Sequence, residues 1–463
     1  MADGAQSGFA GCERYCPPAP APRTRPMGLF GLAAALKRNP LECWTERHFE
    51  AFAVEGGLPF GRVLLINDPG AVRRVLLDNA ANYRKDRLQR RVLSAGLGDG
   101  LLSAEADRWR EQRRLAAPMF ALRSVRDFAP AMVRAADGII DRWPDGGAID
   151  ADVEMRRVTL NVLERTIFTD GFGRDAEAIR EAMGEYFEQI GRLTALDLIG
   201  APDFIPRPGA KRVAGTVRFF HRAIDDLVAA RRRQLTARPQ SAPRDMLTQL
   251  LEADDRLSEA EARSNILTFF AAGHETTANA LTWTLFLLSQ SPRWRERVEY
   301  EAAPRRADGP VVIRAVIEEA LRLYPPIAAI SRVALGPDEL AGVKVGKGTL
   351  VVISPYVLHR HRRLWDDPDA FEPGRFLGEA RGGVDRFAYL PFGAGPRTCI
   401  GAEFAMQEAS LVLAAIARRF RLDMAPGQRI WPRLRVTLRP AEGARMIVRR
   451  RQAGPGREDP LRV

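Results

Sequence analysis

The sequence predicts a mainly α fold with a small β region. Most of the chain carries apolar side chains at the three-to-four-residue spacing of helices, as in residues 124–143 and 217–235. Only residues 62–66 and 348–354 have the composition of strands, and the first is followed by a turn and a helix with proline near its start. With 463 residues, 46% of them hydrophobic, the chain can bury a large core.

A long apolar helix is predicted over residues 258–289. It begins at a capping box formed by Ser258 and Glu261 and ends at the sequence SPRW, residues 291–294. At about 1.5 Å per residue it would be about 45 to 50 Å long, enough to cross a domain. Because it is apolar nearly all round, we expect it to be buried.

A membrane span over residues 266–288 is the alternative, since the segment is long enough. The sequence HETT, residues 274–277, lies at its midpoint, where ionisable side chains would be costly in lipid. We therefore expect a helix through a protein core and no transmembrane anchor.

The centre of this helix, AAGHETT, permits two interpretations. Gly273 and the adjacent threonines can loosen one turn, either for packing alone or to open a groove that holds water. In such a groove, the acid Glu275 beside the alcohol Thr276 would suit proton delivery into a dry pocket.

The charge and cysteine content bound the function and the compartment. The net charge is +12, but the arginines are spread along the chain between acids, which argues against nucleic-acid binding. Cys12 and Cys16 are expected to be free thiols in a flexible tail, 1–28, and residues 451–463 are expected to form a second tail. The start lacks the pattern of a signal peptide, so a reducing cytoplasm is expected.

The stretch FGAGPRTCIG, residues 392–401, surrounds the lone Cys399 with glycines. A structural zinc site would need four ligands, and His359 and His361 do not have the required spacing with this cysteine. Nucleophilic catalysis would need a base, which the sequence does not exclude. An axial thiolate on haem iron needs no further protein ligand on that side, since the porphyrin supplies four.

The residues around Cys399 fit the haem interpretation. Gly393, Gly395 and Gly401 would let the backbone turn close to a flat macrocycle and point N–H groups at the sulfur. A helix is expected after Gly401, and its positive end would favour the thiolate. Arg397 could pair with a haem propionate.

This stretch resembles the haem-binding signature of the cytochrome P450 family, Phe-x-x-Gly-x-Arg-x-Cys-x-Gly, at every specified position from Phe392 to Gly401. AAGHETT resembles the oxygen-activating turn of that family's long distal helix. EALR resembles its Glu-x-x-Arg helix, with Glu319 and Arg322, and FEPGRF its following loop, with Arg375. Gly374 replaces the glutamate usual before that arginine, which puts one contact in doubt.

Two further segments resemble the parts of this family that bind the haem propionates. They are WREQR, with Trp109 and Arg113, and ISRVAL, with Arg332. The resemblance implies a single cytochrome P450 domain over residues 29–450 that holds haem b (iron protoporphyrin IX) between the long helix and Cys399. It also implies an O2-dependent monooxygenase, with Thr276 holding oxygen and water and Glu275 relaying protons.

The resemblance also implies a separate electron donor. Soluble bacterial members use a ferredoxin with its reductase, and we expect an acidic ferredoxin to dock on a basic surface. The arginines proposed for that surface are Arg108, Arg110, Arg113, Arg114, Arg418 and Arg419.

The expected substrate pocket is largely apolar. By resemblance its walls include Phe269, Phe270, Ala272, Pro326, Ile327, Ala328 and Ile330. Such walls predict a hydrophobic small-molecule substrate. The alternatives are a peroxide-driven peroxygenase on the same fold and, in another class, a non-enzymatic haem sensor or basic binding protein.

Overall fold

The computed structural model describes residues 14–58, 61–87, 89–90, 98–169, 210–253, 258–303 and 310–451. The α-helices in these ranges are α1 Leu29–Arg38, α2 Pro69–Arg73, α4 Ala106–Ala116, α5 Leu122–Asp127, α6 Ala129–Ile140, α7 Ala151–Ile167, α10 Ala210–Ala237, α11 Met246–Ala253, α12 Glu259–Gln290, α13 Pro292–Glu301, α14 Val311–Leu323, α15 Pro355–Leu358, α16 Gly378–Gly382 and α17 Ala402–Arg419.

The strands are β1 Ala53–Leu58, β2 Gly61–Ile66, β3 Tyr83–Arg84, β4 Ala148–Asp150, β5 Ile330–Ala334, β6 Asp338–Leu340, β7 Val343–Val345, β8 Leu350–Ile353, β9 Phe420–Met424, β10 Pro432–Leu434, β11 Leu438–Pro440 and β12 Arg445–Arg450. Among the described residues the largest sheet has five strands in the order β1-β2-β8-β5-β3. In it β2 and β8 are parallel, and the other neighbours are antiparallel. The smaller sheets are β4-β12-β9, β10-β11 and β6-β7.

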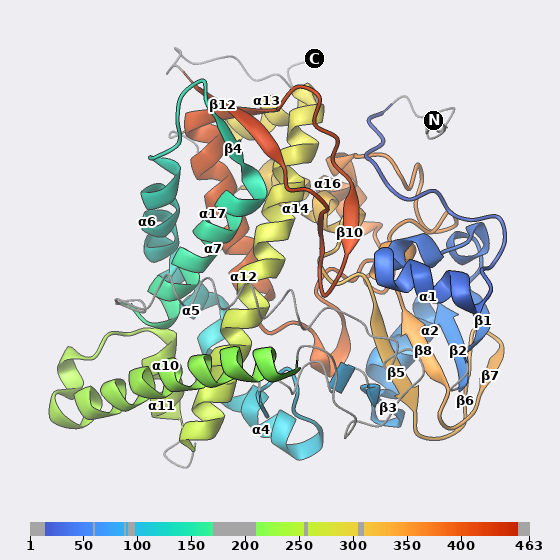
Figure 1. Ribbon diagram of the computed structural model, residues 1–463, viewed down its shortest axis with the longest axis horizontal. Helices are drawn as coiled ribbons and strands as arrows, with labels where there is room; N and C mark the ends of the chain where they lie inside the picture. The colour runs from blue at the N-terminus through green and yellow to red at the C-terminus, as the bar shows by residue number, and fades with distance from the viewer. Residues whose placement is uncertain are drawn as a thin grey trace.

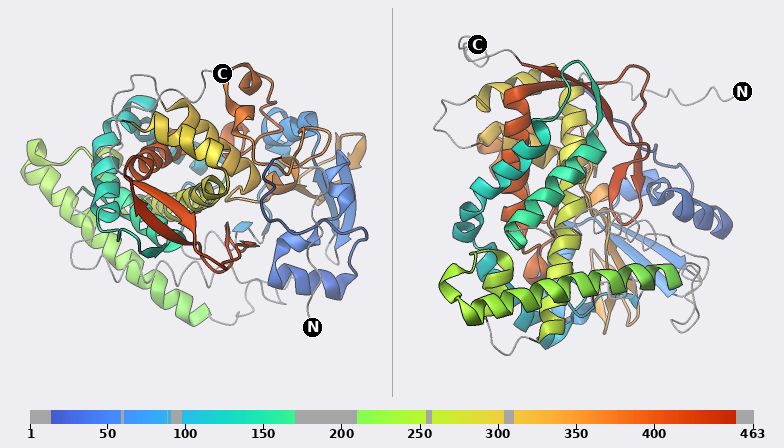
Figure 2. Two further views of the ribbon diagram at one scale, coloured as in Figure 1. Left: turned by 90° about the horizontal axis from the view of Figure 1, so that it is seen from above. Right: turned by 60° about the vertical axis from the view of Figure 1, so that its left-hand side comes forward.

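The helices and the main sheet occupy different sides of the molecule. In Figure 1, α6, α7 and α17 lie with α12 in a helical body, and the sheet with β2 and β8 lies on the other side beside α1. The view from above separates the same two parts, and α10 runs along the helical side (Figure 2). The mainly α fold with a small β region is confirmed.

The long helix predicted from the sequence is α12. Its N-cap, Ser258, forms the expected capping box with Glu261, and it ends at Gln290, followed by the C-cap Ser291 immediately before Pro292. Nearly all of its side chains after Ala262 are buried in the main core. In the part of the chain that the structure describes, no helix has the length and apolarity needed to cross a membrane.

Gly273 lies in a continuous helix, since α12 shows no break at this residue. Its α-carbon faces α7: an added Cβ would lie 3.0 Å from a Leu163 methyl carbon. The missing side chain therefore permits close approach of α7 and α12, which favours the packing interpretation of this glycine.

The expected tail over residues 1–28 is packed in its second half. Tyr324 donates a hydrogen bond to the Pro18 carbonyl at 2.7 Å, and the Tyr15 ring contacts Phe286 edge-on at 6.2 Å between centroids. Cys16 is disulfide-bonded, so the expected free thiol was wrong, whereas Cys12 lies outside the described residues. Tertiary contacts thus order a segment whose composition is typical of a loose tail.

Candidate active site

The Cys399 loop is a tight turn before α17. The Cys399 N–H donates to the Phe392 carbonyl at 2.8 Å, which closes the loop. Gly393 and Gly395 have φ of +69° and +71°, in the left-handed region that favours glycine. Gly401 is the N-cap of α17 at φ −90°, so a left-handed turn does not explain this third glycine.

The residue Cys399 is exposed as a whole, but its sulfur lies among the atoms of its loop, and the other free cysteine of the described residues, Cys43, is far away in the sequence. Burial of the sulfur by its surroundings raises the pKa of the thiol, whereas the Gly401 N–H and the Arg113 charge lower it. The expected stabilisation of the thiolate is present but is outweighed by burial. Bonding to a metal cation would remove this proton outright.

Arg397, Arg113 and Arg332 come from three elements. Arg397 donates to Glu105 at 2.8 Å and lies over the Trp109 ring, 4.4 Å from its centroid. Arg113 of α4 donates to the Thr398 carbonyl at 2.7 Å. Burial, and next the charge of Arg397, lower the pKa of Arg332 on β5. The predicted propionate residues are therefore electrostatically coupled.

Lys85 belongs to this basic group, although the sequence did not single it out. Its amino group donates to the Leu102 carbonyl at 2.6 Å and lies 3.4 Å from Glu105. Burial and then Arg397 lower its pKa to about 8.

Lys85, Arg332 and Arg397 therefore share the carboxylate of Glu105, Asp86 also acts on Arg332, and Arg113 adds a positive charge beside Arg397. A group with two carboxylates would neutralise the excess positive charge. Haem b carries two propionate carboxylates, so this group of basic residues suits its charge.

The middle of α12 has one accessible face. Ala272 is exposed and Thr276 is half-buried, one turn apart on a helix otherwise enclosed by core side chains. The Thr276 hydroxyl donates to the Ala272 carbonyl at 2.7 Å. Phe269 contacts Phe120 edge-on, and Phe120 also lies against Gly401. These contacts link the helix to the Cys399 loop.

Glu275 is buried on a different side of α12. Its carboxylate lies 4.0 Å from the Arg439 guanidinium on β11. Burial raises its pKa, whereas Thr437, Arg439 and Arg156 lower it in part. The structure therefore makes Glu275 a carboxyl group that retains its proton more readily than a solvated one.

Glu319, Arg322 and Arg375 form a buried cluster. Glu319 and Arg322 are fully buried and make a two-pronged ion pair at 2.6 and 2.8 Å. Arg375 lies 3.6 Å from Glu319 and donates to the Asp367 carbonyl. Gly374 stands in the turn of Pro373–Phe376, where Glu372 accepts its N–H at 3.0 Å. The three charged residues come together as the resemblance implied.

The expected pocket residues divide into accessible and enclosed groups. Ala272, Ile327 and Ile330 are exposed or half-buried. Ile330 is near the Cys399 loop, since a Cβ on Gly393 would lie 3.9 Å from its terminal methyl carbon. Phe270 and Ala328 are buried at 2% and 3% exposure in the core.

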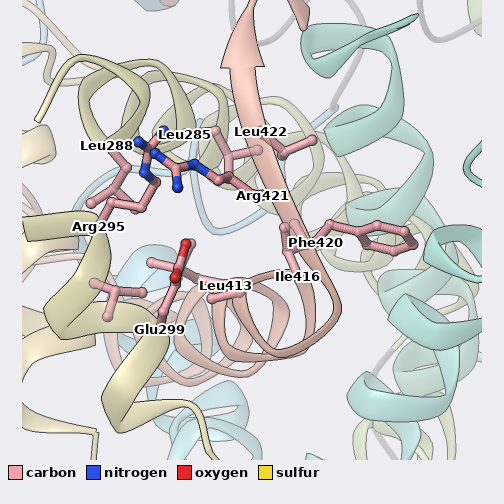
Figure 3. Close-up of a pocket in the computed structure, with 11 residues that line it drawn as sticks. Leu285, Leu288, Arg295, Glu299, Leu413, Ile416, Phe420, Arg421 and Leu422 are labelled. Atoms are coloured by element: carbon pink, nitrogen blue, oxygen red, sulfur yellow. The ribbon is translucent and has the colours of Figure 1, made fainter. Parts of the chain in front are cut away.

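A small cavity between α12, α13, α17 and β9 is separate from these residues. Its volume is about 30 Å³, and its walls include Leu285, Leu288, Ile416 and the charged Arg295 and Glu299 (Figure 3). That volume holds about one or two water molecules, so it does not suit an organic substrate.

Comparison with known proteins identifies the family. The cytochrome P450 family model matches residues 58–448. Cyclooctatin synthase of Streptomyces melanosporofaciens is 34% identical over 89% of this chain and 91% of its own length. Pentalenene oxygenase of Streptomyces avermitilis is 32% identical over 72% of this chain and 76% of its own. A 6-coordinated cytochrome P450 from Thermus thermophilus has a TM-score of 0.66 at 32% identity, covering 84% and 92% of the two chains.

The fold and the cysteine loop define the class, a haem-thiolate protein, and the chain belongs to the cytochrome P450 family. It is an oxygen-incorporating oxidoreductase that acts on hydrophobic substrates, and its family implies a haem cofactor. The predictions of family, fold class and enzyme class are therefore confirmed.

Proposed function

We propose that this chain binds haem b through the Cys399 sulfur and inserts one oxygen atom from O2 into a terpene-like hydrocarbon. The observation that carries the proposal is the exposed residue Cys399 in a closed loop that also holds Arg397, one of three cations, with Lys85 and Arg332, that share Glu105. When bound, the haem would supply the redox chemistry of oxygen activation.

The protein's own residues would fix the cofactor and handle protons. Lys85, Arg332 and Arg397 would pair with the propionates, and Gly395 keeps its loop against the Leu76 carbonyl, where a side chain would collide. The Thr276 hydroxyl, held by the Ala272 carbonyl, would orient a proton donor on the accessible face of α12. Glu275 would store the proton that is delivered there.

The substrate class is argued from the accessible apolar residues and from the relatives. Ile327 is 43% exposed although it is large and apolar, and Ala272 and Ile330 add small or branched apolar surface. Two relatives are named for cyclooctatin and pentalenene chemistry. A terpene, which offers shape and few polar groups, fits such walls.

An acidic ferredoxin remains our proposal for the electron donor. The structure divides the six arginines considered for docking: Arg108, Arg110 and Arg419 pair with acids of this chain, and Arg113 is turned toward Thr398. Arg114 and Arg418 are exposed and form no ion pair with a described acid. We therefore expect Arg114 and Arg418 to contribute most to steering.

A ligand titration tests the proposed function. Holoenzyme titrated with pentalenene should show a saturable spin-state change in its optical spectrum, followed by an oxygenated product when ferredoxin, reductase and O2 are added. A fatty acid of similar mass serves as the control ligand. Saturable binding of the fatty acid alone would contradict the substrate class, and turnover with peroxide but none with the electron donors would establish the peroxygenase instead.

A further inference from the structure

A group of buried polar side chains connects α7, α12 and the segment at β11. Its members, which we call the α7–α12 polar cluster, are Asp152, Arg156, His274, Glu275, Thr277, Asn279, Thr437 and Arg439. All except Arg156 and Arg439 are less than 9% exposed. The sequence analysis singled out only His274, Glu275 and Thr277, because the members outside α12 lie more than 100 positions away.

The cluster is held together by a few direct contacts. Arg156 donates to Asp152 one helical turn earlier, and Asn279 donates to the Thr437 hydroxyl at 3.0 Å. Thr159 of α7 donates to the His274 carbonyl at 3.0 Å, which joins the two helices. The contact between Arg439 and Glu275, at 4.0 Å, is too long for a hydrogen bond.

The cluster holds an unusual concentration of buried polar atoms that have no hydrogen-bond partner among the described residues. These atoms are Asp152 Oδ1, Arg156 Nε, His274 Nδ1, Glu275 Oε2, Thr277 Oγ1 and Asn279 Oδ1. Leaving six such groups unpaired would cost a free energy comparable to the whole stability of a typical domain. Ordered water, which pairs with two to four polar atoms at such sites, resolves this cost.

The cluster also leads from the core to solvent. The side chains of Glu275 and Asp152 are each 8% exposed, whereas Arg439 and Arg156 are 24% and 30% exposed. Polar groups therefore continue from the buried carboxyl to the surface beside α7 and β11. We propose that Asp152, Arg156 and Arg439, with water on the unpaired atoms, form the route by which protons from solvent reach Glu275.

The transfer conserves protons and needs no other reactant. A water at the outer end gives a proton to the next oxygen, one O–H bond breaks as another forms at each step, and the last proton binds Glu275 Oε2 after this carboxyl has lost its own. Asp152 accepts and passes on the proton, and Arg156 orients Asp152 through their hydrogen bond. His274 is kept neutral, since burial lowers its pKa to about 4.

This inference rests on the proposed function, but its first test does not measure turnover. Infrared difference spectra of the holoenzyme at mildly acidic pH should show a protonated carboxyl band that disappears in Glu275→Gln. After mixing with D2O, that band should shift about tenfold more slowly in Asp152→Asn than in the parent. The matched control, Asp78→Asn, alters an exposed acid paired with Arg73 and should leave the exchange rate unchanged.

A second variant, Thr277→Val, tests the proposal if Asp152→Asn does not fold. Thr277→Val removes one unpaired hydroxyl with little change in shape, so it should slow exchange if water occupies the cluster. Exchange at the parental rate in both folded variants would overturn the proposal. So would the absence of any carboxyl band assignable to Glu275.

The kinetic consequence separates this inference from the proposed function. In Asp152→Asn we expect turnover to fall about tenfold, the solvent deuterium isotope effect to rise, and more electrons to go to peroxide. The thiolate signature of the carbon monoxide complex should stay unchanged. A normal signature with normal coupling refutes only the proton route, whereas loss of that signature in the parent refutes the proposed function.

Discussion

Replacing the buried Glu319 by glutamine tests the most enclosed ion pair among the described residues. In the parent, Arg322 donates twice to Glu319 and also to the carbonyls of His359, Pro368 and Ala370. Glu319→Gln keeps the shape but leaves two nearby guanidinium groups, those of Arg322 and Arg375, without their carboxylate. We expect the free energy of unfolding to fall by about 3 to 5 kcal/mol.

Glu318→Gln, one position earlier, provides the matched control. Glu318 pairs at 3.2 Å with Arg381, whose side chain is 43% exposed. Solvent screens such a pair, so the loss should be about 0 to 1 kcal/mol. Urea unfolding of the two holoenzyme variants measures the difference. Equal losses, or a loss below about 1 kcal/mol for Glu319→Gln, would refute the reasoning.

Two further predictions concern glycine geometry and a buried acid. Gly395→Ala should lower the free energy of unfolding by at least about 2 kcal/mol and reduce haem content, because its Cβ would overlap the Leu76 carbonyl. The control Gly427→Ala has a similar φ of +76° and open space around it. It should lower the free energy of unfolding by only about 1 kcal/mol and retain haem. Glu408 is fully buried without a described partner, and burial raises its pKa well above the usual value. Because the folded state then binds the proton more tightly, stability falls as pH rises from the unfolded to the folded pKa. Glu408→Gln should therefore raise the unfolding free energy by about 1 to 3 kcal/mol at pH 8 and hardly at pH 4 in urea titrations; destabilisation at pH 8 would contradict this.

Local patterns were sufficient for the elements that carry the site. The capping box at Ser258 and the stop before Pro292 gave the bounds of α12 to within one residue, because caps act through neighbouring residues. The strand predicted at 62–66 is β2, and the helix expected after Gly401 is α17. In both cases most of the element's apolar side chains are buried, and a glycine stands at or directly before its first residue.

Properties that depend on packing could not be predicted from spacing. Glu319 and Arg322 are three positions apart, as a surface pair would be, and only the surrounding carbonyls show that they are buried. Gly273 permits close packing against Leu163, a contact between helices far apart in sequence. The i, i+4 pair of Asp152 and Arg156 gave no sign of its place beside Glu275. Sequence could likewise not show that Phe270 faces the core.

Binding of the haem iron by the Cys399 sulfur can be measured by comparing the optical spectra of reduced protein variants under carbon monoxide. Cys399→Ala should lose the thiolate signature even when it is loaded with haem. The control Cys43→Ser, at the other free cysteine of the described residues, should keep it. An unchanged spectrum in haem-loaded Cys399→Ala would contradict the account.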